Sequence, residues 1–211
     1  MSSFKNGDGK VIVENLIKVI QENKDYLSKI DGEIGDGDHG INMNKGFTIC
    51  QDRIAGKNIN FTDSLKALAM VLMMEIGGSM GPLYGTMFLE MSKATEGKKD
   101  IDSDVFEEMM EKAVKEIQDL GGAKVGDKTL MDTLVPAKEA FILGKESGFS
   151  AALDQMVGAA EKGKDSTIDL VAKIGRASRL GERSKGVLDA GATSCFLILQ
   201  SMGQTIKGIL T

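Results

Sequence analysis

The sequence predicts an all-α domain of about eight antiparallel helices, and three observations lead to that prediction. Apolar residues recur at helical spacing along nearly the whole chain, and alternating strand patterns bounded by turn residues are scarce. With 211 residues, of which 42% are hydrophobic, the chain can bury one sizeable core. We therefore expect residues 1–211 to form a single domain.

Three apolar stripes predict the first three helices. Each stripe repeats apolar residues three and four positions apart, which places them on one helical face. The stripes are Val13, Leu16, Ile17, Ile20 and Leu27; then Met43, Phe47, Cys50 and Ile54; then Leu65, Leu68, Ala69, Leu72, Met73 and Ile76. The segment 31–38 is thereby predicted to connect two helices.

The next two helices have recognisable beginnings. Pro82 stands where a first-turn proline is expected, and Ser103 can cap the helix that follows it. The corresponding stripes are Leu83, Met87 and Met91, and then Phe106, Met109, Met110, Ala113, Ile117 and Leu120.

Three further stripes complete the set of eight. Pro136 is expected to kink the sixth helix, and the seventh is expected to be long or broken. The stripes are Leu130, Leu134, Ala137 and Phe141; then Leu153, Met156, Val157 and Ala160, followed by Leu170 and Ile174; then Cys195, Ile198, Leu199, Met202, Ile206 and Ile209.

Glycine is concentrated in alternate connections between these helices. Four connections hold 15 of the 26 glycines, namely Gly32, Gly35, Gly37 and Gly40; Gly77, Gly78, Gly81 and Gly85; Gly121, Gly122 and Gly126; and Gly175, Gly181, Gly186 and Gly191. If the helices run up and down in order, all four connections lie at the same end of the bundle. Since helix capping needs one or two glycines per loop, the excess predicts a shared ligand site there.

Charge and composition exclude several classes of protein. A formal net charge of -5 and a pI near 5.1 disfavour nucleic acid or an anionic membrane as the main partner, the cluster Arg176, Arg179, Arg183 and Lys185 being the local exception. The longest apolar run, 67–74, is far short of the roughly 20 residues that cross a bilayer, and the N-terminus lacks the apolar core of a signal peptide. We expect a cytoplasmic protein whose two cysteines, Cys50 and Cys195, are reduced core thiols.

The segment IDGEIGDGDHGINMN carries the strongest chemical signal. Its residues 35–40 satisfy the G-x-G-x-x-G pattern, but aspartates would repel a pyrophosphate, and a helical stripe precedes the pattern where a dinucleotide turn needs a strand. A calcium loop starting at Asp36 would place Phe47 where a glutamate is required. Asp31, Asp36 and Asp38 instead supply hard oxygen ligands for one or two Mg²⁺ ions, whose shells phosphate oxygens could complete.

Two other features near this chemistry are weaker signals. The run GGAKVGDKT resembles a Walker A loop with one residue inserted, but it follows a helix, so a true P-loop is not expected. His39 is the only histidine, and its carboxylate neighbours favour a positively charged ring beside phosphate. A serine hydrolase is excluded because Ser79 and Ser194 lack a second histidine to activate them.

The chain resembles the nucleotide-binding L subunit of bacterial dihydroxyacetone kinases, which is similar to the C-terminal domain of the single-chain ATP-dependent enzymes. Four motifs in the same order carry the resemblance between Asp31 and Ser194: IGDGDHGINMNKGF, GGSMGPLYG, GDKTLMDTLVPA and GRASRLGERSKGVLDAGATS. The resemblance implies a closed barrel of eight antiparallel amphipathic helices with the nucleotide at one end.

The resemblance also implies roles for individual residues. Asp31, Asp36 and Asp38 would ligate two Mg²⁺ ions that bridge the phosphates of ADP or ATP. The residues implied at the nucleotide are His39, Gly40, Ile41 and Asn42, with Ser79 and Met80 beyond them; Gly121 and Met131 beside the base; and Arg176, Asp189, Ala190 and Gly191 closing over it. No catalytic group is implied on this chain beyond these metal and phosphate ligands.

The family's phosphotransferase-linked members imply partners as well. A phosphocarrier M subunit would rephosphorylate bound ADP in place, and the γ-phosphoryl group would pass to dihydroxyacetone held by a histidine of a separate K subunit. Two departures from the family pattern stand in this sequence: Met80 replaces a serine, and Ala190 replaces a proline. Either change could weaken nucleotide retention, and both leave room for another keto-sugar as substrate.

Several alternatives stay open from the sequence. The same loops would serve a non-catalytic, nucleotide-sensing module that docks a transcription regulator. They would also serve the nucleotide domain of a fatty-acid kinase with a separate lipid-binding partner. The sequence does not decide between a phosphocarrier and free ATP as the donor, nor does it fix the oligomeric state, for which a homodimer is one candidate.

Overall fold

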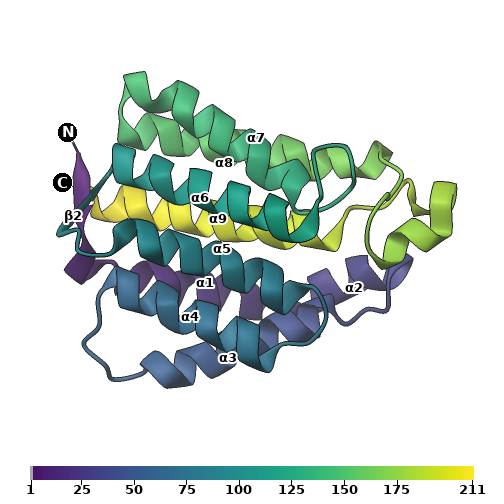
Figure 1. The fold of residues 1–211 in the computed structure, drawn as a ribbon, viewed down its shortest axis with the longest axis horizontal. Helices are drawn as coiled ribbons and strands as arrows, with labels where there is room; N and C mark the ends of the chain where they lie inside the picture. Colours follow the sequence, from purple (N-terminus) through teal and green to yellow (C-terminus); the bar gives the residue numbers. More distant parts are fainter. Residues whose placement is uncertain (1) are drawn as a thin grey trace.

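Helices make up nearly all of the computed structural model, which describes residues 2–211 (Figure 1). The nine α-helices in this range are α1 (Lys10–Glu22), α2 (Lys24–Ile34), α3 (His39–Ile54), α4 (Phe61–Glu75), α5 (Met80–Thr95), α6 (Ser103–Gly121), α7 (Met131–Gly144), α8 (Phe149–Ser166) and α9 (Ala190–Ile209). Short 3-10 helices are η1 (Asn6–Asp8), η2 (Lys145–Ser147), η3 (Thr167–Asp169) and η4 (Arg176–Ser184), and the strands are β1 (Ser3–Lys5) and β2 (Asp100–Asp102). The predicted all-α class is confirmed.

Eight of the helices form a closed ring. Helices α3 to α9 pack against one another in chain order, and α1 closes the ring by packing between α9 and α3. Buried apolar residues from all nine helices form one cluster inside it. The helical stripes predicted from the sequence therefore face a common core.

The ninth helix arises because the first predicted stripe is interrupted at Asn23. The Asn23 side chain donates a hydrogen bond to the carbonyl oxygen of Val19 (2.8 Å), and its backbone N–H turns to the same carbonyl and to that of Ile20. An asparagine that satisfies the last carbonyls of a helix in this way ends it. Helix α2 then continues past the break, packs on α3 and α9, and carries Asp31.

A two-stranded ribbon was not predicted from the sequence. β1 and β2 pair antiparallel with Phe4 opposite Ile101, and both of these side chains are completely buried. Strands of three residues are too short to show an alternating pattern, so periodicity could not reveal them.

The seventh predicted helix is broken, as the sequence allowed. Helix α8 ends at Ser166, so Leu170 and Ile174 lie in the connection to α9 and not on a helical stripe. Helix α7 runs across Pro136 without ending there. Cys50 and Cys195 are buried free thiols, as expected for core residues. Within the described range, no helix is both long and apolar enough to cross a membrane.

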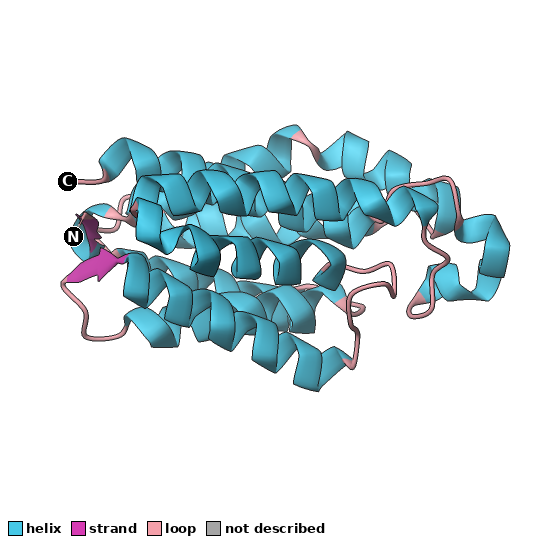
Figure 2. Cartoon of the chain, turned by 90° about the horizontal axis from the view of Figure 1, so that it is seen from above, coloured by secondary structure: helices cyan, strands magenta, loops and turns pink. Residues whose placement is uncertain are grey.

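The two ends of the barrel differ in character. The ribbon and both chain ends lie at one end, and the long connections gather at the other (Figures 1 and 2). These connections are 35–38, 76–79, 122–130 and 167–189, which are the glycine-rich ones. The sequence argument that they share one end therefore holds.

Candidate metal and phosphate site

A cavity of about 390 Å³ opens at the glycine-rich end of the barrel. All four glycine-rich connections contribute to its walls, through Asp36, Gly78, Thr129 and Gly175 among others. Residues far apart in the sequence thus meet at one concave surface, which is where a ligand site is expected.

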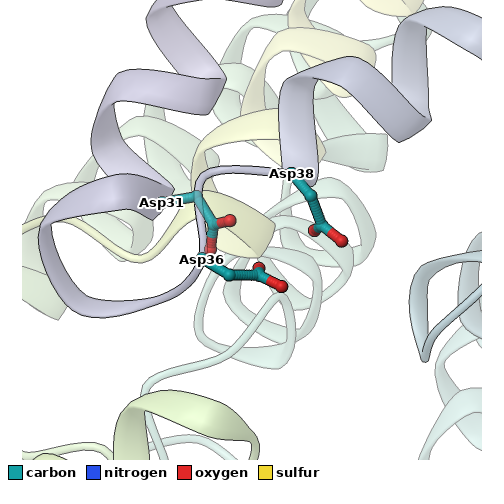
Figure 3. A group of neighbouring side chains, drawn as sticks. All are labelled: Asp31, Asp36 and Asp38. Atoms are coloured by element: carbon teal, nitrogen blue, oxygen red, sulfur yellow. The ribbon is translucent and has the colours of Figure 1, made fainter.

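The three predicted aspartates lie together at this cavity (Figure 3). Asp31 is in the last turn of α2, Asp36 is in the α2–α3 connection, and Asp38 is the residue that precedes α3. One carboxylate oxygen from each lies within 4.8 Å of the corresponding oxygens of the other two. Three negative charges at this separation repel one another, so the arrangement favours a cation between them.

Two glycines make this turn sterically feasible. A Cβ atom at position 35 would lie only 2.4 Å from a carboxylate oxygen of Asp31. Gly37 has φ +75°, a conformation that costs a glycine little and other residues more. The glycines thus allow the chain to bring Asp31 and Asp36 to the same point.

The geometry and the donor set both fit a divalent cation. Carboxylate oxygens are hard ligands of the kind that Mg²⁺ takes, and at these separations their oxygens could share one ion or bridge two. The guanidinium of Arg176, at the start of η4, forms an ion pair with Asp36 and supplies one positive charge at the rim. Three carboxylates against one guanidinium still leave a negative site.

His39 is buried, lines the cavity and belongs to a hydrogen-bond network within the cavity wall. Its Nε2 atom lies 2.8 Å from the Ser194 hydroxyl, which lies 2.6 Å from the Tyr84 hydroxyl. Tyr84 also donates to the carbonyl oxygen of Gly191 (2.9 Å). This network links the first turn of α3 to helices α5 and α9.

The expectation of a positively charged His39 is wrong. Burial lowers the pKa of His39 to about 4, because the ring loses the water that would stabilise its charged form. The carboxylates next to it in sequence do not overcome this desolvation, so the imidazole is neutral near pH 7. Ser194, which contacts this histidine, is completely buried.

The first turn of α3 carries three residues that the resemblance placed at the phosphates. Gly40, Ile41 and Asn42 are not among the residues that line the cavity. A Cβ at Gly40 would lie 1.9 Å from the carbonyl oxygen of Lys24, so this glycine is required for α2 to pack on α3. Ile41 is exposed on the barrel surface.

The remaining predicted residues all line the cavity. They are Ser79, Met80, Gly121, Met131, Arg176, Asp189, Ala190 and Gly191. Met80 is the first residue of α5 and packs against the hydrophobic core. Asp189 caps α9 by accepting a hydrogen bond from the N–H of Ala192 (2.7 Å), and burial raises its pKa to about 7.

Part of the cavity lining is apolar. It comprises Ile34, Leu83, Ile117, Leu120, Ala123, Leu130 and Met131. The 122–130 connection beside it is held by Asp132, whose carboxylate accepts from the N–H groups of Gly126 (2.6 Å) and Thr129 (2.7 Å). An acidic rim next to an apolar wall suits a ligand that is charged at one end and apolar at the other.

Sequence reasoning missed two residues that organise the site. Tyr84 lies inside the quoted motif GGSMGPLYG, but no pattern shows that its hydroxyl reaches α9. Lys128 drew attention only as part of the false Walker A loop, and its real partners are backbone carbonyls of a distant segment. Contacts between residues 39 or more positions apart leave no local signal in the sequence.

The fold and this cavity define an all-α barrel with a group of three aspartates beside apolar residues at one end. The chain belongs to the DAK2 domain family, whose match covers residues 33–204. It is 37% identical over 194 residues to the ADP-binding subunit of PEP-dependent dihydroxyacetone kinase from Escherichia coli (strain K12), covering 90% of this chain and 91% of that one.

Two further comparisons agree with this assignment. The ADP-binding subunit of PEP-dependent dihydroxyacetone kinase 1 from Listeria innocua is 41% identical over 187 residues, which are 88% of this chain and 89% of the relative. The dihydroxyacetone kinase from C. freundii, solved in complex with AMP-PNP and Mg²⁺, has the same fold with a TM-score of 0.72 at 20% identity. That match covers 93% of this chain but 33% of the longer enzyme.

Proposed function

We propose that this chain is the ADP-binding subunit of a phosphoenolpyruvate-dependent, phosphotransferase-linked dihydroxyacetone kinase. The observation that carries the proposal is the meeting of three carboxylates at a cavity whose lining also includes a group of apolar residues. Relatives that match nine tenths of the chain carry this activity in their names. The chemistry of the cavity fits the two parts of ADP, a charged diphosphate and a planar base.

Each side of the cavity has a role in this proposal. Asp31, Asp36 and Asp38 would hold two Mg²⁺ ions, which when bound neutralise the phosphate charge and orient the transferring group. Met131 and Gly121 would contact the base. Arg176 and the segment 189–191 would cover the nucleotide from the η4 side, where they already line the cavity.

His39 lines the phosphate site in the proposal as a neutral ring that is held in place by hydrogen bonds. Because the Tyr84 hydroxyl donates to Gly191, it accepts from the Ser194 hydroxyl, and Ser194 in turn accepts from the Nε2–H group of His39. The ring proton then resides on Nε2, and Nδ1 has no protein partner in the described chain. Positioning of this kind needs no change of charge during the reaction.

The transfer itself requires a second protein. The bond from the γ-phosphorus to the β–γ bridging oxygen breaks, a new bond to a keto-sugar hydroxyl forms, and the hydroxyl proton leaves to a base. His39 is a weak base here, because burial lowers its pKa to about 4. We therefore assign the substrate and the base to a K subunit, and the return of phosphoryl to ADP to an M phosphocarrier subunit.

Co-purification of nucleotide tests the binding part of the proposal. The purified protein is denatured, and its supernatant is separated by anion-exchange chromatography. We expect ADP in the supernatant, and we expect prior dialysis against EDTA to remove it. An empty protein that takes up no ADP with or without Mg²⁺ would contradict the proposal.

Turnover tests the catalytic part. The chain is mixed with K and M subunits, phosphoenolpyruvate and the proteins that carry phosphoryl groups from phosphoenolpyruvate to the M subunit. Formation of triose phosphate is then measured. We expect product only when all components and dihydroxyacetone are present. Product from free ATP without the M subunit would instead identify ATP as the donor.

A further inference from the structure

Lys128 is a completely buried lysine with an unusual set of partners. Its side chain is 2% exposed, and it is the only non-glycine residue between positions 2 and 211 with a positive φ (63°). The ammonium donates to the carbonyl oxygens of Thr167 (2.6 Å), Leu170 (3.2 Å) and Val187 (2.6 Å). Burying a charge and adopting a disfavoured backbone conformation both cost free energy, so the site has to gain from these bonds.

The three carbonyls mark the two ends of one loop. Thr167 and Leu170 belong to the segment that follows α8, and Val187 lies just before α9. Two more bonds cross the same neck: Gly186 N–H donates to the Ile168 carbonyl (2.7 Å), and Asp189 N–H donates to the Thr167 hydroxyl (3.0 Å). The chain between them, residues 171–186, is therefore a loop whose neck is held together by Lys128.

The 171–186 loop projects beyond the glycine-rich end of the barrel (the green segment at the far right of Figure 1). It carries Ile174, Gly175, Arg176 and Ala177, which line the cavity, and Arg176 pairs with Asp36. The position of the neck thus determines where Arg176 lies relative to the three aspartates.

Lys128 also belongs to the opposite wall. It lies three positions before Met131, and its neighbour Asp127 accepts a backbone hydrogen bond from Lys173 (3.1 Å) and forms an ion pair with the Lys173 side chain (3.4 Å). The 122–130 connection and the 171–186 loop are therefore fastened to each other at Lys128.

We propose that Lys128 is a positioning residue that fixes the neck of the 171–186 loop and so holds Arg176 and the loop over the nucleotide cavity. The nucleotide part of this inference rests on the proposed function. Lys128 does not act as a phosphate ligand, because all three of its N–H donors are already engaged by carbonyls. Its role therefore differs from that of a P-loop lysine.

Limited trypsin digestion tests the inference directly. The loop contains five cleavage sites, Lys173, Arg176, Arg179, Arg183 and Lys185. In EDTA and without nucleotide, Lys128→Met should accelerate cleavage at these sites by roughly ten- to a hundredfold, because a charged donor to three carbonyls is lost. Peptides are identified by mass spectrometry, so that cleavage inside the loop is separated from cleavage elsewhere.

Lys145→Met is the matched control. Lys145 also makes several side-chain contacts, but it bonds the carboxylates of Asp104 and Glu107 near η2, away from the loop. We expect its loop cleavage to equal that of the unmodified protein. The inference would be overturned if trypsin cleaved Lys128→Met faster at sites throughout the chain, or if cleavage in the loop were not faster at all.

A second variant keeps the test available if Lys128→Met does not fold. Thr167→Val removes the hydroxyl that accepts from Asp189 but leaves the carbonyl that Lys128 binds. It should accelerate loop cleavage by a smaller factor, roughly three- to tenfold. Unchanged cleavage in a folded Thr167→Val protein would count against a closed neck.

Nucleotide then separates this inference from the proposed function. Saturating ADP with Mg²⁺ should protect Arg176 from cleavage in the unmodified protein, and a fluorescent ADP analogue should leave Lys128→Met faster in stopped flow. If nucleotide gives no protection, the proposed function fails while the loop result stands. If nucleotide protects but release is unchanged in Lys128→Met, the positioning role fails.

Discussion

Asp36 is the most exposed member of the acidic group, and its side chain depends on two charges of opposite effect. Asp31 and Asp38 repel it, and Arg176 attracts it. The carboxylate contributes little to packing because about two fifths of its side chain is exposed (41%). Its position is therefore explained by ligand binding better than by stability.

Replacing Asp36 should separate binding from folding. Asp36→Asn keeps the shape but removes one charge facing the metal and phosphates, so we expect a folded protein that releases ADP roughly tenfold faster or more in Mg²⁺. Release is measured by stopped flow with a fluorescent ADP analogue. Glu33→Gln is the control, because Glu33 is an exposed acid of the same turn that lies outside the group of three. Equal retention in both variants would place the metal elsewhere.

Met80 lines the cavity at the first residue of α5. The sequence comparison with the family suggested that the missing serine hydroxyl weakens phosphate binding, but Met80 packs on the hydrophobic core. Met80→Ser should therefore lower the free energy of unfolding by about 1–2 kcal/mol and quicken ADP release roughly two- to tenfold. Chemical denaturation and the stopped-flow assay measure the two effects. Slower release would show that a hydroxyl at this position binds phosphate.

At the scale of elements, the helix stripes were predictable, but several boundaries and contacts were not. The stripe from Val13 to Leu27 gave no sign that Asn23 would end α1, because the apolar spacing continues across it. The strands β1 and β2 are too short to produce an alternating pattern in the sequence. The neck closed by Lys128 joins segments that only the folded chain brings together.

The first turn of α9 should make stability depend on pH through Asp189. Its folded-state pKa of about 7 lies above the ordinary value of 3.8, because burial opposes the charge more than the Ala192 N–H supports it. Because its pKa is raised on folding, Asp189 makes a contribution to stability that is fully present below about pH 4. This contribution is lost as the pH rises through 7. About three pKa units correspond to at most about 4 kcal/mol.

Asp189→Asn isolates this contribution. Asparagine can still cap α9 but cannot ionise. As the pH rises from 4 to 7.5, the free energy of unfolding of the variant should therefore increase relative to that of the unmodified protein by up to a few kcal/mol. The free energy of unfolding is measured by urea titration in EDTA at several pH values. Asp154→Asn, which removes an exposed carboxylate, should run parallel to the unmodified protein. The same parallel course in Asp189→Asn would show that Asp189 does not titrate in this range.

The whole molecule combines a predictable scaffold with a site assembled from its loops. Apolar spacing predicts the ring of helices, and glycine spacing predicts which end carries the ligand site, because both follow from helix geometry. The grouping of the three aspartates also follows from their proximity in sequence. The neutral state of His39 does not, since it depends on burial by α5 and α9.

Nucleotide binding should stabilise the entire barrel. The cavity draws residues from α2, α5, α6, α7 and α9 and their connections, so a ligand bound there holds the end of the ring together. At a hundred times the dissociation constant, a ligand adds about 2.7 kcal/mol to the free energy of unfolding. For a chain of 211 residues this corresponds to a rise in Tm of roughly 5–10 °C. Differential scanning fluorimetry with ADP and Mg²⁺ measures the rise, and EDTA should abolish it because the phosphates would then face the aspartates without a cation. A rise of equal size with ADP and EDTA would show that the nucleotide binds without metal, and the three aspartates would need another role.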